Sequence, residues 1–147
     1  MSVITGVRVL LSVALAVVAI VHLKISSNYA DIGSPLSLRG QFVLQGIGGL
    51  VLAAAVLVPL VRSLGRLDRL VWLAALGFGA VSLGPLVYSR YKPLPIPGFP
   101  KPGFQETWEV EGAVLSAFAE SAVIVLALVG LALTLSARSR TREPAAA

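Results

Sequence analysis

The chain has 147 residues, of which 56% are hydrophobic and only 13% charged, and its formal net charge is +5 at pH 7. A soluble domain carries about 25% charged residues, so the composition excludes an ordinary soluble protein and favours a membrane protein. With no cysteine and one histidine, the chain lacks the usual ligands of a metal or haem site, and we predict no metal and no cofactor.

Four stretches are apolar and long enough to cross a bilayer, whose hydrocarbon core needs about 20 helical residues. The predicted spans are residues 3–23, 41–61, 70–88 and 110–135. Backbone groups in lipid must find hydrogen-bond partners within the chain, so we predict an all-α, four-helix transmembrane bundle. It comprises residues 1–137, and residues 138–147 form a flexible tail.

The first span has two interpretations. Arg8 followed by a long apolar run fits a cleaved signal peptide. We expect a retained helix instead, because the run is long and no A-x-A-like cleavage site follows Val21.

The basic residues are divided unevenly between the two sides of the predicted bundle. One side holds seven arginines with little compensating acid: Arg8, Arg62, Arg66, Arg69, Arg138, Arg140 and Arg142. The richer side of a membrane protein faces the cytoplasm. We therefore predict a plasma-membrane protein with both termini cytoplasmic and its two longer loops, after the first and third spans, extracytoplasmic. Because these arginines flank the spans, the positive charge needs no nucleic-acid partner, and none is predicted.

Small residues recur at helical spacing in the second and third spans. Without a hydrophobic driving force in lipid, helices associate through close packing of small side chains, although glycine is also simply common in membrane helices. The residues predicted to pack helix on helix are Gly46, Gly49, Ala53, Ala75 and Gly79. A second stripe on the third span predicts packing on two sides, at the bundle centre or against another protein: Gly77, Ala80 and Gly84.

Glu120 is a carboxylic acid deep in the fourth span. It lies nine residues beyond Glu111, which at 1.5 Å per residue is about 13 Å into the membrane. A charge at that depth costs a few kcal/mol, so Glu120 needs a partner, a proton or a wet cavity. Residues at similar depth or on the same face predict a polar seam, with His22 and Tyr29 nearer the interface. The predicted seam comprises Glu120, Gln45, Ser82, Ser116, His22 and Tyr29.

Three roles for Glu120 remain open. It can fix helix register, neutral or bonded to Gln45 and Ser82. It can form a ligand or proton site with His22 above it, or it can contact another subunit.

The stretch "YKPLPIPGFPKPGF", residues 91–104, has five prolines. Proline fixes φ and removes a backbone donor, and a stiff polyproline-like segment loses little entropy when it docks. The segment is either a clasp over its own bundle or a docking surface, while Trp108 also suits a membrane-interface anchor. The predicted partner-docking residues are Pro95, Pro97, Phe99, Pro100, Phe104 and Trp108.

Several short motifs together carry a resemblance: "VHLKI", "NYADIG", "LRGQFVLQGIGGLVLA", "PGFQETW" and "AESAVIVL". With them the chain resembles small, largely uncharacterised four-helix integral membrane proteins of actinobacteria. The resemblance implies that His22, Tyr29 and Glu120 recur in such proteins. It brings no activity or cofactor with it.

No catalytic motif is present: there is no glycine-rich phosphate loop, no G-x-S-x-G and no H-E-x-x-H. We therefore predict no enzyme. The predicted function is a non-catalytic accessory or structural subunit of a larger integral-membrane complex, for example an energy-converting or oxidoreductase assembly. Its predicted partners are other integral-membrane subunits and the lipid bilayer. The alternative is a small-molecule or proton binding or carrier protein that uses the seam around Glu120.

Overall fold

A computed structural model describes residues 2–29, 37–61, 67–95 and 103–140. Its long helices are α1 (Val3–Ile25), α2 (Leu38–Leu57), α3 (Leu67–Tyr91) and α4 (Ala113–Arg140), and short 3-10 turns follow two of them, η1 (Ser26–Asn28) and η2 (Val58–Leu60). Within these residues there is no strand, only an isolated bridge between Leu94 and Phe104. All four long helices are long and apolar enough to cross a membrane, which confirms the predicted all-helical class.

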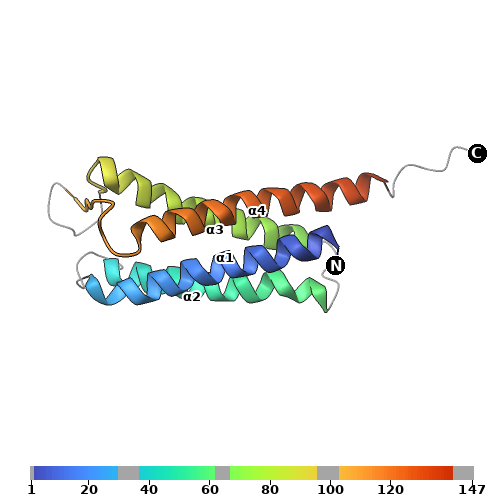
Figure 1. Cartoon of the computed structure of the whole chain (residues 1–147), viewed down its shortest axis with the longest axis horizontal. Coiled ribbons are helices and arrows are strands. Elements are labelled where there is room, and N and C mark those ends of the chain that lie inside the picture. Colours follow the sequence, from blue (N-terminus) through green and yellow to red (C-terminus); the bar gives the residue numbers. More distant parts are fainter. Residues whose placement is uncertain (1, 30–36, 62–66, 96–102, 141–147) are drawn as a thin grey trace, which may run out of the picture.

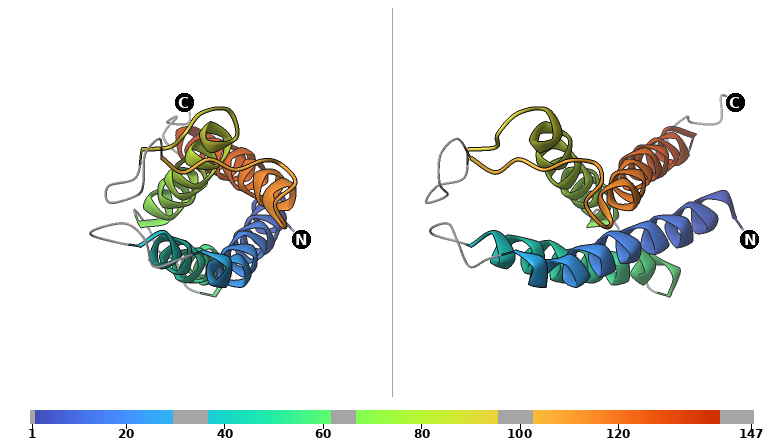
Figure 2. Two further views of the ribbon diagram at one scale, coloured as in Figure 1. Left: turned by 90° about the vertical axis from the view of Figure 1, so that its left-hand side faces the viewer. Right: turned by 60° about the vertical axis from the view of Figure 1, so that its left-hand side comes forward.

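The four helices run alternately up and down and surround a common axis in the order α1, α2, α3, α4 (Figures 1 and 2). The terminal end of the bundle is where α1 begins and α4 ends. The cap end is where α1 and α3 end, and residues 92–95 and 103–112 at that end are called the cap. Among neighbouring pairs, α2 and α3 share the smallest interface.

The helices begin where local chemistry supplies caps. The hydroxyl of Ser2 accepts a bond from the backbone N–H of Thr5, and Ser37 does the same for Gly40, which satisfies donors that have no partner inside the helix. Helix α4 begins at Ala113, three residues later than predicted. The reason is that Gly112 has a φ of 81°, a left-handed conformation that favours glycine and interrupts a helix.

The predicted small residues lie inside the bundle. Gly46, Gly49, Ala53, Ala75 and Gly79 are all buried. A Cβ built on Gly49 meets the Cβ of Ala19 in α1 at 3.1 Å, and one on Gly79 meets Val123 in α4 at 3.0 Å. The stripes on α2 and α3 therefore set how closely those helices approach α1 and α4. The second stripe on α3 is different: Gly77, Ala80 and Gly84 are exposed, and a Cβ on Gly77 or Gly84 meets nothing within 4 Å.

A buried ion pair joins three helices at the terminal end. One guanidinium nitrogen of Arg8 lies 2.6 Å from Asp68 Oδ1, and the other donates to the carbonyl of Val56 at 3.2 Å. The guanidinium carbon stands 4.6 Å from the ring centroid of Trp72, a cation–π contact. The sequence alone does not reveal these partners of Arg8, because they lie on other helices.

Gly130 of α4 makes room for Trp72. A Cβ at Gly130 would overlap the indole ring, and Trp72 is fully buried. We expect Gly130→Ala to lower the free energy of unfolding by about 1–3 kcal/mol, the usual cost of overpacking a core. Thermal unfolding of the full chain in detergent micelles measures it. Gly77→Ala is the matched control and should be neutral or stabilising, since its Cβ meets open space. Equal effects of the two changes would contradict the packing described.

Candidate functional site

A cavity of about 80 Å³ lies at the cap end, with walls from all four helices and the cap. On this measure a single water needs about 10–15 Å³, so the cavity has room for several waters or a small organic group. Most of its wall is apolar. The polar side chains that line it are His22, Tyr29, Gln41, Gln45, Ser82, Ser89, Arg90, Glu106, Glu111 and Ser116.

Glu120 lies at the deep end, behind the wall of this cavity. Its side chain is 0% exposed, within a helix that can cross a membrane. The hydroxyl of Ser116, one turn earlier, donates to Glu120 Oε1 at 2.9 Å, and His22 Nε2 stands 3.6 Å from the same oxygen. Its second oxygen, Oε2, has no hydrogen-bond partner among the described residues. A buried acidic group with an unused oxygen is costly unless it is protonated or a ligand contacts it.

His22 is fixed by its own helix and by an aromatic neighbour. Its Nδ1 lies 2.8 Å from the carbonyl oxygen of Val18 in the preceding turn. The ring of Phe42 in α2 packs beside it at a centroid distance of 5.4 Å, and Gln45 of α2 lines the same cavity. With Nδ1 bonded to Val18, the other ring nitrogen, Nε2, is the one that faces Glu120.

Ser82 contributes a second unused group. It is 4% exposed and lines the cavity, yet its hydroxyl has no hydrogen-bond partner within the described chain. The bonds considered above from Ser82 and Gln45 to Glu120 are therefore not what the structure shows. Ser116 is four residues from Glu120 on the same helix face and donates to it, while Gln45 lines the cavity.

The cap is fastened by a buried three-residue cluster. Glu106 accepts a hydrogen bond from the Tyr29 hydroxyl at 2.7 Å and another from Arg90 at 2.9 Å. The Arg90 and Glu106 side chains are 5% and 16% exposed. Burial raises the pKa of Tyr29, and its bond to Glu106 raises that pKa further, so Tyr29 stays a neutral donor. Tyr29 thus belongs to the cap cluster and not to the Glu120 cluster. Sequence analysis missed Arg90 and Glu106 because their pairing depends on how the cap folds back.

Aromatic rings close the cap over the cavity. Leu94 and Phe104 exchange two backbone hydrogen bonds of 2.7 and 2.9 Å. Tyr29 stacks on Phe42 at 4.4 Å, and Phe104 meets the edge of Tyr29 at 5.7 Å. Phe104 therefore packs on its own bundle, as a clasp does.

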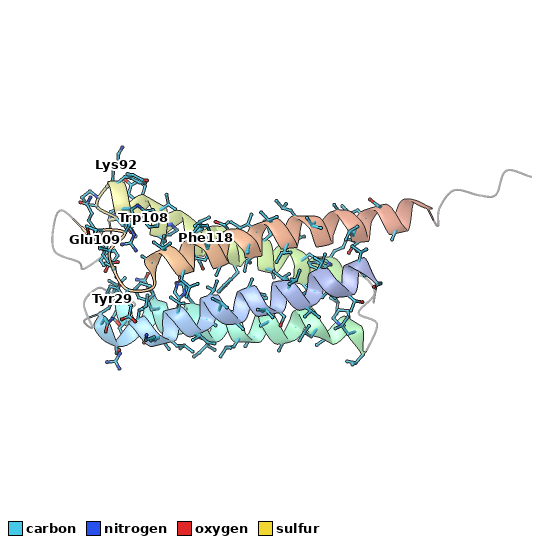
Figure 3. The ribbon with its side chains drawn as sticks, in the orientation of Figure 1. Tyr29, Lys92, Trp108, Glu109 and Phe118 are labelled. Carbon is cyan, nitrogen blue, oxygen red and sulfur yellow. The ribbon has the colours of Figure 1, made fainter. Side chains whose placement is uncertain are left out.

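The other predicted docking residues divide into two groups. Trp108 is 38% exposed, with the Arg90 guanidinium 5.6 Å from its ring centroid, and Pro95 is exposed. Tyr29, Lys92, Trp108 and Glu109 gather at the cap end (Figure 3). Pro97, Phe99 and Pro100 lie outside the described residues.

These features define a multi-pass helical membrane protein with a partly polar cavity near one end of its bundle. No known protein family, curated protein or solved structure matches the chain, so its function has to be argued from geometry. In the described ranges no three His, Cys, Asp or Glu side chains lie close enough to hold a metal ion.

The cap cluster predicts a local effect of Glu106→Gln. This change leaves the buried Arg90 guanidinium without its counter-charge, and breaking a buried ion pair in this way costs about 3–5 kcal/mol. We expect faster amide hydrogen exchange at Leu94 and Phe104, measured by mass spectrometry in detergent. The matched control is Glu111→Gln, which breaks the exposed pair with Lys24. Exposed pairs contribute little, so the control should keep the protection of the cap. Unchanged exchange in Glu106→Gln would show that the cluster does not hold the cap.

Proposed function

We propose that this protein binds a small, mostly apolar molecule in the cavity at the cap end of its bundle. The observation that carries the proposal is that two residues that line the cavity have buried polar atoms without partners. Ser82 Oγ and Arg90 Nε both belong to lining residues, and neither has a hydrogen-bond partner in the described structure. Each such atom costs about 1–3 kcal/mol. A ligand that bonds to them recovers this free energy.

The positions of these atoms restrict the ligand. Ser82 and Arg90 are eight residues apart on α3, about 12 Å along the helix. The wall between them includes apolar residues of three helices, among them Ile25, Phe42 and Leu86. A ligand with an apolar body, a hydrogen-bond acceptor for Arg90 at one end and a polar group for Ser82 at the other suits this arrangement.

We further propose that the cap end faces outward from a plasma membrane and that both termini are cytoplasmic. The uneven distribution of arginines between the two predicted sides of the bundle supports this orientation. The cavity then lies in the outer half of the membrane. The resemblance to small actinobacterial membrane proteins stays a prediction.

A second candidate function is the accessory subunit of a larger integral-membrane complex. It is supported by the exposed small-residue stripe on α3, where Gly77 and Gly84 have no neighbour within the described chain. A shallow apolar groove runs beside this stripe, between α3 and Ile124, with Tyr88 and Tyr91 among its walls. A helix of another subunit could approach α3 closely there.

Ser82→Leu tests the binding proposal. The larger side chain fills part of the cavity and removes the unpaired hydroxyl, so we expect a low-mass ligand to be lost. Native mass spectrometry of protein extracted gently from its own membrane measures the adduct. Ser121→Leu is the matched control, because Ser121 is on the exposed face of α4 and bonds to its own helix. An adduct retained equally by both variants, or absent from the wild type, would refute binding in this cavity.

Ala80→Phe tests the accessory-subunit candidate. We expect it to release partner subunits, because a phenyl ring blocks close approach to the α3 stripe. Native electrophoresis of gently extracted protein, with mass spectrometry of the band, measures the assembly. Ala54→Phe, on an exposed position of α2, should leave the assembly intact. A wild-type protein that migrates alone as a small band would eliminate this candidate.

A further inference from the structure

We propose that His22 and Glu120 together form a proton-binding site that holds one exchangeable proton, carried either by His22 Nε2 or by the Glu120 carboxyl group. The inference deepens the proposed function, on which it rests for the role of the cavity, by stating what the site exchanges with its surroundings.

The tautomer of His22 follows from its bond to Val18. A carbonyl oxygen only accepts hydrogen bonds, so the 2.8 Å contact requires a hydrogen on Nδ1 of His22. In a neutral imidazole the other nitrogen then carries a lone pair. Nε2 is therefore the basic atom of this ring.

That basic atom faces the acid. Nε2 and Glu120 Oε1 are 3.6 Å apart, slightly beyond hydrogen-bond length. A bare nitrogen and an ionised oxygen would repel each other at this distance, whereas a proton on either atom removes the repulsion. Two forms meet this condition: a neutral imidazole with a carboxylic acid, and an imidazolium with a carboxylate. Both carry one proton and no net charge.

Loss of that proton leaves an isolated carboxylate in a fully buried position. Glu120 is 0% exposed, and an uncompensated charge in a membrane helix is strongly unfavourable. Gln45, Ser82 and Ser116, which line the same cavity as His22, are uncharged. The charged residues that line the cavity are already paired at the cap: Arg90 with Glu106 and Glu111 with Lys24. The pair therefore keeps its proton at rest.

The cavity gives this proton a route. His22 and Ser116 line the cavity, while Glu120 lies behind them. A proton that arrives from water or from a bound molecule in the cavity therefore reaches His22 before Glu120. Without this proton the pair consists of a neutral ring and a carboxylate. Uptake forms an N–H bond at His22 Nε2, and release breaks the bond that holds the proton and restores the neutral ring and the carboxylate.

The sequence makes the test unusually direct, because the chain has one histidine. Nitrogen-15-labelled histidine gives one pair of ring resonances by NMR on the full chain in micelles. Infrared spectroscopy of the same sample reads the carboxylic acid band. We expect a protonated Nδ1 near neutral pH, together with either a protonated Nε2 and an ionised Glu120 or a bare Nε2 and a protonated Glu120. A bare Nδ1, or a bare Nε2 beside an ionised Glu120, overturns the proposal.

Two variants assign the result to Glu120. In Glu120→Gln one readout must change: the carboxylic acid band disappears, or Nε2 loses its proton. Glu109→Gln, at an exposed position outside the spans and outside the cavity wall, should change neither readout. A Glu120→Gln protein with both readouts unchanged also overturns the proposal. These measurements need no ligand. A shared proton without a low-mass adduct refutes only the binding function, and an adduct without a shared proton refutes only this inference.

Discussion

Within a bilayer no water is present to complete a hydrogen bond, so each polar side chain in the bundle needs a partner from the chain itself. At both ends of the bundle the structure pairs charged side chains with each other. Arg8 and Asp68 join helices at the terminal end, and Arg90, Glu106 and Tyr29 join helix to cap at the other. The register of the helices depends on these two clusters, because sliding one helix would leave a charge unpaired.

Between the two ends, close backbone approach replaces the hydrophobic effect. Gly46 and Gly49 bring α2 against α1, and Gly79 and Gly130 bring α3 and α4 together. The bundle is thus built as two tight pairs that are also joined through α1 and α4. Because α2 and α3 share the smallest interface of the ring, their cap-end halves leave the space in which the cavity forms.

The sequence was sufficient for features that depend on local composition. Hydropathy located the four helices, and depth along the fourth helix singled out Glu120. Four-residue spacing correctly placed Ser116 beside it. The sequence does not reveal pairs that depend on helix rotation, such as Arg8 with Asp68. Nor could it place Tyr29, because the chain after Tyr91 must fold back before Glu106 can reach that hydroxyl. The late start of α4 follows from a single glycine conformation that periodicity does not reveal.

The buried polar atoms without partners show where this protein departs from stability alone. In the described structure they are Trp72 Nε1, Ser82 Oγ, Arg90 Nε and Glu120 Oε2. All but Trp72 Nε1 belong to residues that line the cavity or lie directly behind its wall. Replacing Ser82 and Glu120 by apolar residues would remove two of these costs, since apolar replacement of buried polar pairs is often neutral or stabilising. Their clustering around one cavity, next to the sole histidine, is therefore what a site under functional constraint looks like. A bundle that needed only to span the membrane would have no reason to keep them.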